Sequence, residues 1–234
     1  MLISGIQPFT MLDYPGETAA IIFTAGCNFR CGYCHNPEFV VPELLAKIKN
    51  NFIPETAILN FLESRRGLLT GVVVSGGEPT IQPDLLEFLK KIKNLGFKVK
   101  LDTNGNRPEF LRAALAARAL DYIAMDYKTS ASAYPALVGP LAVAEKIAAS
   151  RELLKNSDVE YEFRATLIKE VHSDILLTAM QEELAGAKRF FLQQFRPGIT
   201  LAAAFGAFHP FSVDEMEEIA TKFRRVIPHV AVRA

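Results

Sequence analysis

Six apolar runs rich in β-branched residues alternate with six segments of helical spacing, and this order limits the fold more than any other feature. The apolar runs lie at 19–25, 71–75, 97–101, 121–126, 159–165 and 188–194. Helices are predicted after them at 55–66, 83–94, 108–118, 141–155, 174–185 and 213–225. A repeating β/α order predicts an α/β fold of parallel strands joined by right-handed crossovers.

Local signals support the predicted helix boundaries. Pro83 and Pro108 each open a helical segment, Gly96 ends one, and Ser212 with Glu215 forms an S-x-x-E capping box. No low-complexity linker interrupts the series, so we expect one domain over 1–234. It would comprise an irregular leader at 1–18 with a turn at 13–16, a core at 19–200, and a C-terminal helix and tail at 201–234.

Charge and hydropathy exclude several classes of protein. Twenty-six basic and twenty-six acidic residues cancel, and no block of one sign suggests a nucleic-acid or membrane surface. No apolar stretch approaches the roughly 18 residues that span a bilayer. The first residues also lack the basic and apolar regions of a secretory signal. We therefore expect a cytoplasmic protein that binds neither nucleic acid nor membrane directly.

All three cysteines of the chain, Cys27, Cys31 and Cys34, lie within eight residues. An odd number of cysteines in one short loop argues against disulfides and favours metal or redox chemistry. Three thiolates can converge on one soft metal centre, yet they leave one iron of a four-iron cluster without a protein ligand. Such an iron can bind another molecule.

A zinc site is the competing interpretation of this loop. His35 follows Cys34 directly, so the four residues could form a closed Cys3His site. Adjacent ligands are poorly spaced for a tetrahedral metal, which makes this interpretation the weaker one. The histidines at 172, 209 and 229 are isolated and are expected to be surface or core residues.

The unusual polar residues follow the ends of the predicted strands. In parallel β/α folds the loops after the carboxyl ends of strands meet at one rim, where ligands bind. We therefore expect the cysteine loop to share this rim with residues 76–79 (GGEP), 102–105 (DTNG), 126–128 (DYK), Arg164, Gln193, Gln194 and Arg196.

These motifs resemble those of a known family. C-x3-C-x2-C after a first strand and GGEP after the second are similar to the radical S-adenosylmethionine enzymes. The strings GIQPFTMLDYPG, GCNFRCGYCHNP, LDTNG and MDYK resemble activating enzymes of glycyl-radical proteins, over about residues 5–200. Within that group they look most like the activating proteins of anaerobic ribonucleoside-triphosphate reductase, with pyruvate formate-lyase activase a close relative.

The resemblance implies a partial (β/α)6 barrel of parallel strands, open on one side to admit a polypeptide. It also implies that Cys27, Cys31 and Cys34 hold one [4Fe–4S] cluster whose fourth iron chelates the methionine part of S-adenosylmethionine. Reductive cleavage would give a 5′-deoxyadenosyl radical, which would remove a hydrogen atom from a glycine α-carbon of a partner enzyme.

The resemblance further assigns cofactor-binding residues. Gly76 and Gly77 would let the backbone approach the ligand, Glu78 and Asp102 would accept from its ammonium group, and Lys128 and Arg164 would bind its carboxylate. Tyr33 would shield the cluster or the adenine edge, as Phe29 also could, and Gln194 or Arg196 would touch the nucleoside. A monovalent cation would bind at Asp102, Thr103 and Asp126. From the residues alone, 102–105 is equally a plain turn, and Tyr33 and Phe29 equally pack on the loop.

Three other functions stay open at this stage. The enzyme could activate a pyruvate formate-lyase-like protein instead of the reductase, it could act on a small molecule, or the chain could be a zinc-binding module. An electron donor such as flavodoxin or ferredoxin is expected as a second partner. The motifs do not distinguish the activated protein, the reductant or the oligomeric state.

Overall fold

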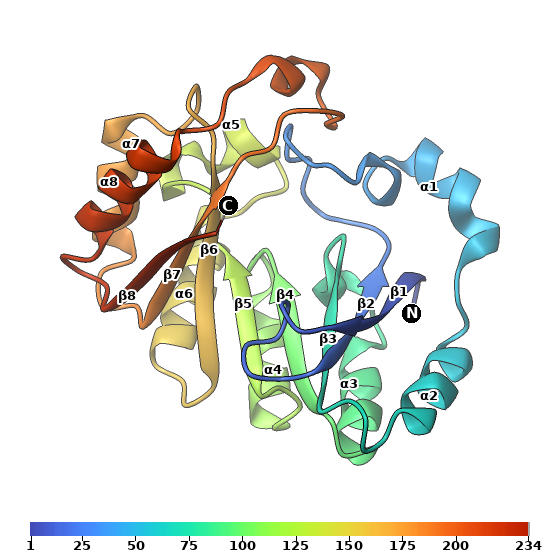
Figure 1. Ribbon diagram of the computed structural model, residues 1–234. Helices are drawn as coiled ribbons and strands as arrows, with labels where there is room; N and C mark the ends of the chain where they lie inside the picture. The colour runs from blue at the N-terminus through green and yellow to red at the C-terminus, as the bar shows by residue number, and fades with distance from the viewer. Residues whose placement is uncertain (234) are drawn as a thin grey trace. The chain divides into compact units, whose positions relative to one another are not determined.

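A computed structural model describes residues 1–233, which form two compact units. The first unit comprises residues 1–28, 37–103 and 107–123. The second comprises residues 29–36, 104–106 and those from 124 onward. Hydrogen bonds connect the strands in sequence order from β1 to β8. Figure 1 shows the strands and helices along the chain, coloured from the N-terminus to the C-terminus.

The first unit contains strands β1 to β4. β1 (Ile3–Thr10) pairs antiparallel with β2 (Ala19–Thr24), and β2 pairs parallel with β3 (Gly71–Gly76), which pairs parallel with β4 (Lys98–Thr103). Its helices are α1 (Pro42–Ile48), α2 (Glu55–Ser64), α3 (Leu85–Asn94) and α4 (Pro108–Ala116). Short 3-10 helices lie at Pro37–Phe39, Lys49–Asn51 and Pro79–Ile81.

The second unit contains the parallel strands β6 (Glu160–Leu167), β7 (Arg189–Gln194) and β8 (His229–Arg233). Its helices are α5 (Tyr134–Val138), α6 (Ala144–Lys155), α7 (Asp174–Glu183) and α8 (Val213–Phe223), and 3-10 helices lie at Ala131–Ala133 and Ala203–Ala207. Strand β5 (Tyr122–Asp126) contributes its first two residues to the first unit and its last three to the second.

Each unit buries apolar strand residues against its helices. In β3, Val72, Val73 and Val74 are all fully buried, as expected for a parallel strand that is covered on both faces. In the second unit the rings of Phe190 on β7 and Phe223 on α8 lie 4.9 Å apart, centroid to centroid. These contacts fix the strands whose carboxyl ends carry the polar loops.

The predicted α/β fold with parallel strands is confirmed, and all six predicted strands and six predicted helices are present within a few residues of their expected bounds. The strand order has two ends, β1 and β8, so the described residues form an open sheet. Ser212 and Glu215 form the predicted capping box on α8. No helix within residues 1–233 is long and apolar enough to cross a membrane.

Two predictions about the ends of the chain are wrong. The leader at 1–18 is not irregular, because it contains β1, which pairs with β2. The turn expected at 13–16 lies between these two strands, where Glu17 N–H donates to Tyr14 C=O. The tail after α8 contains another parallel strand, β8. The sequence analysis also missed the short helices α1 and α5.

Candidate functional site

The cysteine loop begins directly after β2. None of its cysteines forms a disulfide; Cys31 is buried, and Cys27 and Cys34 are partly exposed. The N–H of Cys34 donates to the carbonyl of Cys31 at 3.0 Å, which makes a tight turn of the segment between them. Burial raises the pKa of the Cys31 thiol, and the positive charge of Lys128 opposes that rise.

The expected three-cysteine ligand set spans the two units, since Cys27 belongs to the first and the other two cysteines to the second. Neither unit contains, among residues 1–233, a group of three or more His, Cys, Asp or Glu side chains arranged to hold a metal ion. The ligand set therefore stays a prediction that depends on the loop and on the chemistry of thiolates.

Gly76 and Gly77, at the end of β3, lie against the start of the cysteine loop. A Cβ atom on Gly76 would lie 2.3 Å from the carbonyl oxygen of Thr24, and one on Gly77 would lie 2.1 Å from that of Gly26. Gly76 also has a φ of +113°, which L side chains rarely adopt. Both glycines are therefore required by close contact with the chain's own backbone, whereas the prediction that they admit a ligand stays a prediction.

Glu78 follows these glycines and is almost completely buried. Its Oε1 atom accepts hydrogen bonds from the Thr80 hydroxyl at 2.5 Å, from the Thr80 N–H at 3.2 Å and from the Thr103 hydroxyl at 2.7 Å. Glu78 thereby caps the short helix Pro79–Ile81 and holds the end of β4. A buried carboxylate that accepts these hydrogen bonds is held in one position.

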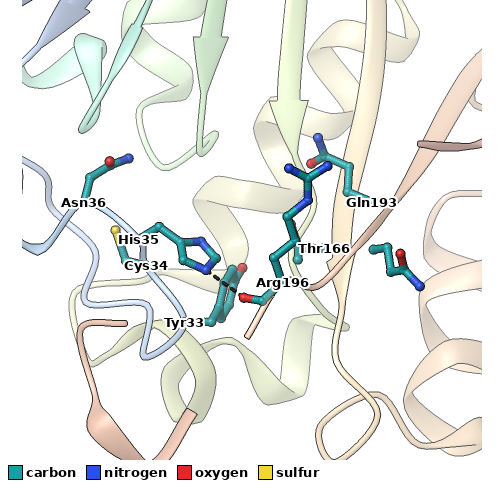
Figure 2. Close-up of a pocket in the computed structure, with 8 residues that line it drawn as sticks. Tyr33, Cys34, His35, Asn36, Thr166, Gln193 and Arg196 are labelled. Carbon is teal, nitrogen blue, oxygen red and sulfur yellow. Dashed lines mark hydrogen bonds between the residues drawn. The ribbon is translucent and has the colours of Figure 1, made fainter. Parts of the chain in front are cut away.

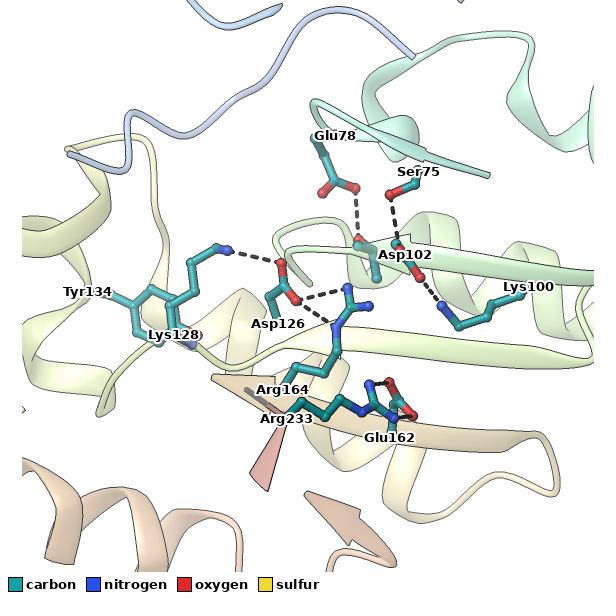
Figure 3. Close-up of polar contacts among 11 residues, drawn as sticks. Ser75, Glu78, Lys100, Asp102, Asp126, Lys128, Tyr134, Glu162, Arg164 and Arg233 are labelled. Atoms are coloured by element: carbon teal, nitrogen blue, oxygen red, sulfur yellow. Dashed lines mark hydrogen bonds and ion pairs between the residues drawn. The ribbon is translucent and has the colours of Figure 1, made fainter. Parts of the chain in front are cut away.

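Asp102 pairs with a lysine that the sequence analysis did not single out. Lys100 is buried, its ammonium group forms an ion pair with Asp102 Oδ1, and Ser75 donates to Asp102 Oδ2 at 3.0 Å (Figure 3). Lys100 and Asp102 are two residues apart on one strand, so their side chains share a face. A basic residue in a strand usually indicates a solvated face, which is why the pattern did not reveal this pair.

Asn104 forms the plain turn that was the alternative interpretation of residues 102–105. Its Oδ1 accepts from the N–H of Asn106 at 3.0 Å, and Gly105 has a φ of +76°. A Cβ atom on Gly105 would lie 2.2 Å from the Met125 side chain. The interpretation of this segment as a turn is confirmed for Asn104 and Gly105.

Asp126, Lys128 and Arg164 form an ionic cluster in the second unit (Figure 3). Asp126 Oδ2 accepts from Lys128 Nζ at 3.0 Å, while Oδ1 lies 3.0 Å from both Nε and Nη2 of Arg164. Burial alone would raise the pKa of Asp126, but the charges of Lys128 and Arg164 and their hydrogen bonds outweigh it and lower the pKa to about 2. Asp126 is therefore ionised at neutral pH, and the cluster carries one net positive charge.

The backbone of Tyr127 and Lys128 is held at three points, two of them by residues, Tyr134 and His172, that were not predicted as part of the site. The Lys128 N–H donates to the Tyr134 hydroxyl at 2.9 Å, its carbonyl accepts from His172 Nε2 at 2.9 Å, and the preceding Tyr127 N–H donates to the Arg164 carbonyl at 2.7 Å. His172 Nδ1 accepts from the Ile168 N–H at 3.0 Å, which leaves the proton on Nε2. These contacts fix where the Lys128 side chain begins.

Tyr33 lies between this cluster and a pocket. Lys128 Nζ is 5.9 Å from the centroid of the Tyr33 ring, within reach of a cation–π interaction. The Tyr33 hydroxyl is buried and has no hydrogen-bond partner among residues 1–233. The pocket has a volume of about 260 Å³ and is shown in Figure 2; it is lined by Tyr33, Cys34, His35, Asn36, Thr166, Gln193, Gln194 and Arg196.

His35, the residue on which the zinc interpretation depends, is engaged elsewhere. Its Nε2 atom lies 2.8 Å from the carbonyl oxygen of Arg196 (Figure 2). Its ring stacks on Phe195, with centroids 6.1 Å apart. The side-chain amide of Gln194 donates to the Phe211 carbonyl at 2.8 Å. His35 therefore anchors the end of the cysteine loop through its Nε2 atom.

The residues present fit the expected cofactors. Three cysteines outside disulfides on one short loop suit an iron–sulfur cluster. The pocket beside Cys34 contains a buried aromatic hydroxyl that lacks a partner in the described chain, and polar side chains of β6 and β7. Such a pocket suits a polar small molecule more than a closed structural metal.

Comparison with known proteins supports the same assignment. Residues 21–179 match the Radical SAM superfamily. A Methanocaldococcus jannaschii protein, provisionally named a glycyl-radical enzyme activating enzyme, is 29% identical over 99% of this chain and 95% of its own length. A Clostridium pasteurianum pyruvate formate-lyase-activating enzyme is 34% identical over 44% of this chain and 43% of its own length.

Solved structures show the same fold. The crystal structure of Streptococcus suis SuiB superposes with a TM-score of 0.67 at 13% identity, over 92% of this chain and 48% of that protein. The family match covers more than half of the chain, and it includes the cysteine loop, the GGEP motif and the ionic cluster. The chain therefore belongs to the Radical SAM superfamily, and its cofactors are a [4Fe–4S] cluster and S-adenosylmethionine.

Proposed function

We propose that this enzyme installs a glycyl radical on a partner enzyme. The observation that carries the proposal is the surroundings of Cys31 in the second unit, where Lys128 interacts with both the Cys31 thiol and the Tyr33 ring. A fixed cation beside a thiolate-bearing loop suits a zwitterionic ligand that binds next to the cluster. When bound, the cluster and S-adenosylmethionine supply a 5′-deoxyadenosyl radical that can remove a hydrogen atom.

The charges of the two polar clusters match the groups assigned to them. In the second unit, Lys128 and Arg164 supply two cations beside Asp126, and a cation suits the carboxylate of the methionine part. In the first unit, Glu78 and Asp102 supply carboxylates, and a carboxylate suits the ammonium group of the methionine part. We assign these roles to Glu78, Asp102, Lys128 and Arg164.

Tyr33 and the pocket beside it are assigned to the nucleoside. Thr166, Gln193 and Arg196 line this pocket with polar atoms. An adenine ring can stack on an aromatic side chain, and amide groups can pair with its polar edge. The predicted monovalent cation is left out of the proposal, because Asp126 is already bound by two cationic side chains and Thr103 already donates to Glu78.

The partner is proposed from the relatives and from the sequence motifs. The two relatives described above carry the names of activating enzymes for glycyl-radical proteins. We propose anaerobic ribonucleoside-triphosphate reductase as the protein activated, with a pyruvate formate-lyase-like enzyme as the alternative, and a flavodoxin or ferredoxin as electron donor. A cytoplasmic location is part of the same proposal.

The test is made on anaerobically reconstituted protein mixed with reductant, S-adenosylmethionine and each candidate partner in turn. We expect a glycyl signal by electron paramagnetic resonance on the reductase. A signal only on the formate-lyase would select the alternative partner. Formation of 5′-deoxyadenosine without a glycyl signal on either protein would reject activation and favour a radical enzyme that acts on a small molecule.

A further inference from the structure

We propose that residues 196–208, which follow β7, form a cover that holds the second half of the cysteine loop in its ligand-binding conformation, and that Phe205 positions this loop through Gly32. The proposal rests on the assignment of Cys31 and Cys34 as cluster ligands. All of the residues involved belong to the second unit.

Three contacts connect the cover to the loop at Gly32, Cys34 and His35, and in each of them the cover supplies a main-chain group. Leu201 N–H donates to the Cys34 carbonyl and Ala202 N–H donates to the Gly32 carbonyl, both at 2.9 Å. His35 Nε2 lies 2.8 Å from the Arg196 carbonyl oxygen. Together with the turn that Cys34 makes on Cys31, these bonds engage the carbonyl groups of Cys31, Gly32 and Cys34.

The ring of Phe205 lies directly on Gly32. A Cβ atom on Gly32 would lie 2.2, 2.6 and 2.9 Å from three carbon atoms of that ring, so only glycine allows the ring this close. The same ring packs near Tyr33, at 6.2 Å between centroids, and against Phe208, at 4.6 Å. Phe205 therefore contacts both residues that separate Cys31 from Cys34.

The cover is itself built to present this ring. Ala203–Ala207 forms a short 3-10 helix in which Phe205 N–H donates to Ala202 C=O at 2.9 Å and Phe208 N–H donates to Phe205 C=O at 3.1 Å. The segment 197–208 carries no charged residue. This uncharged segment binds the loop at Gly32 and Cys34, so it limits the local opening that would expose the buried Cys31 thiol to water-soluble reagents.

The consequence is that the geometry of the loop depends on packing between Gly32 and Phe205. Replacing Phe205 with alanine removes the ring and frees the loop to open locally. Replacing Gly32 with alanine forces the ring away while Phe205 remains, and it should do little when Phe205 is already absent. The two substitutions should therefore be strongly non-additive.

The experiment measures how fast iodoacetamide alkylates Cys31 in the folded, cluster-free protein, followed by peptide mass spectrometry. We expect alkylation of Cys31 at least tenfold faster in Phe205→Ala and in Gly32→Ala, and no further increase in the double variant. Ile199→Ala is the matched control, because it shortens a side chain of the same cover that is 84% exposed and supplies none of the atoms nearest to Gly32. It should change the rate by less than threefold.

A second measurement follows the visible absorbance of the reconstituted cluster in air. We expect its half-life to shorten in the same two variants and in the same non-additive way. Equal alkylation rates in the wild type and Phe205→Ala would overturn the proposal, as would full additivity in the double variant. Both measurements are independent of any partner enzyme. The proposal about the cover can therefore be rejected while glycyl-radical activation is observed, and it can be supported when no activation is observed.

Discussion

At the scale of single residues, the site combines positions that sequence patterns reveal with others that they hide. The cysteines and the glycines of GGEP are visible because their spacing is unusual. Lys100, Tyr134 and His172 are not, because a lysine in a strand, a tyrosine and an isolated histidine have many ordinary roles. Their contribution depends on burial and on partners far away in the chain, such as the Lys128 carbonyl that His172 binds.

Gly77 offers the sharpest single-residue test of the close contact between GGEP and the cysteine loop. We expect Gly77→Ala to lower the free energy of unfolding by about 2 kcal/mol, because its Cβ would overlap a backbone oxygen that cannot move independently. Gly5→Ala is the matched control, since the nearest atom to its Cβ would be 3.8 Å away. Urea denaturation of both variants checks this, and equal stability would contradict it.

Lys128 tests the ionic cluster. We expect Lys128→Met to raise the KM for S-adenosylmethionine at least about tenfold, as expected for loss of a charge-assisted contact. The exposed Lys146→Met serves as the control for the loss of a positive charge. Initial-rate measurements of 5′-deoxyadenosine formation decide the matter, and an unchanged KM would remove Lys128 from the ligand site.

His172 gives the fold a specific pH dependence. Burial lowers the pKa of His172, against which its two backbone hydrogen bonds act. The unfolded chain, with a histidine pKa near 6.5, then binds the proton first as the pH falls. Stability should therefore decline below about pH 6.5, by at most about 1.4 kcal/mol per pH unit from this residue, until the folded protein is also protonated.

The measurement is the free energy of unfolding from pH 8 to pH 5 for the wild type and His172→Gln. Glutamine can still donate to the Lys128 carbonyl but cannot be protonated in this range. We expect the variant to show a shallower decline than the wild type. Parallel curves would mean that His172 does not account for the decline.

At the scale of helices and strands, the sequence predicted those elements that follow one rule throughout their length. Amphipathic helices with capping residues and apolar strands were found within a few residues of their expected ends. β1 was missed because Gly5, Gln7 and Pro8 interrupt its apolar alternation, and most of its residues are partly or fully exposed. β8 was missed because it is short and has only one buried residue.

An ion pair holds β8 to the rest of the second unit. The local sequence pattern could not predict it, because the two residues are far apart in the sequence. Arg233 binds the buried Glu162 of β6 through two hydrogen bonds of 2.8 and 3.0 Å (Figure 3). Its guanidinium also lies 3.5 Å from the Phe191 ring centroid. We expect Arg233→Ala to cost about 3 kcal/mol, because it leaves a buried carboxylate without this cation.

The double variant Glu162→Gln with Arg233→Met provides the control for that prediction. It removes both charges and keeps side chains of similar length, so it should recover a large part of the lost stability. Thermal or urea unfolding gives both values. If the double variant is less stable than Arg233→Ala, the attraction between the two side chains, rather than the loss of a cation beside a buried carboxylate, would account for the effect.

At the scale of the whole molecule, the repeating β/α order explains how residues scattered from 27 to 196 could be predicted as one functional set. Strand order and the family match confirmed the fold class, the enzyme class and the cofactors. The partner could not be predicted from the sequence. The activating enzymes of the reductase and of pyruvate formate-lyase share nearly all of the cluster and ligand motifs described above.

The central claim is that a glycine of a partner protein supplies the hydrogen atom. The most direct measurement uses a partner reductase whose glycines are deuterated at the α-carbon, mixed anaerobically with the reconstituted enzyme, reductant and S-adenosylmethionine. The account predicts that deuterium appears in the 5′-deoxyadenosine detected by mass spectrometry. Undeuterated 5′-deoxyadenosine as the only product, formed with every candidate partner, would contradict it.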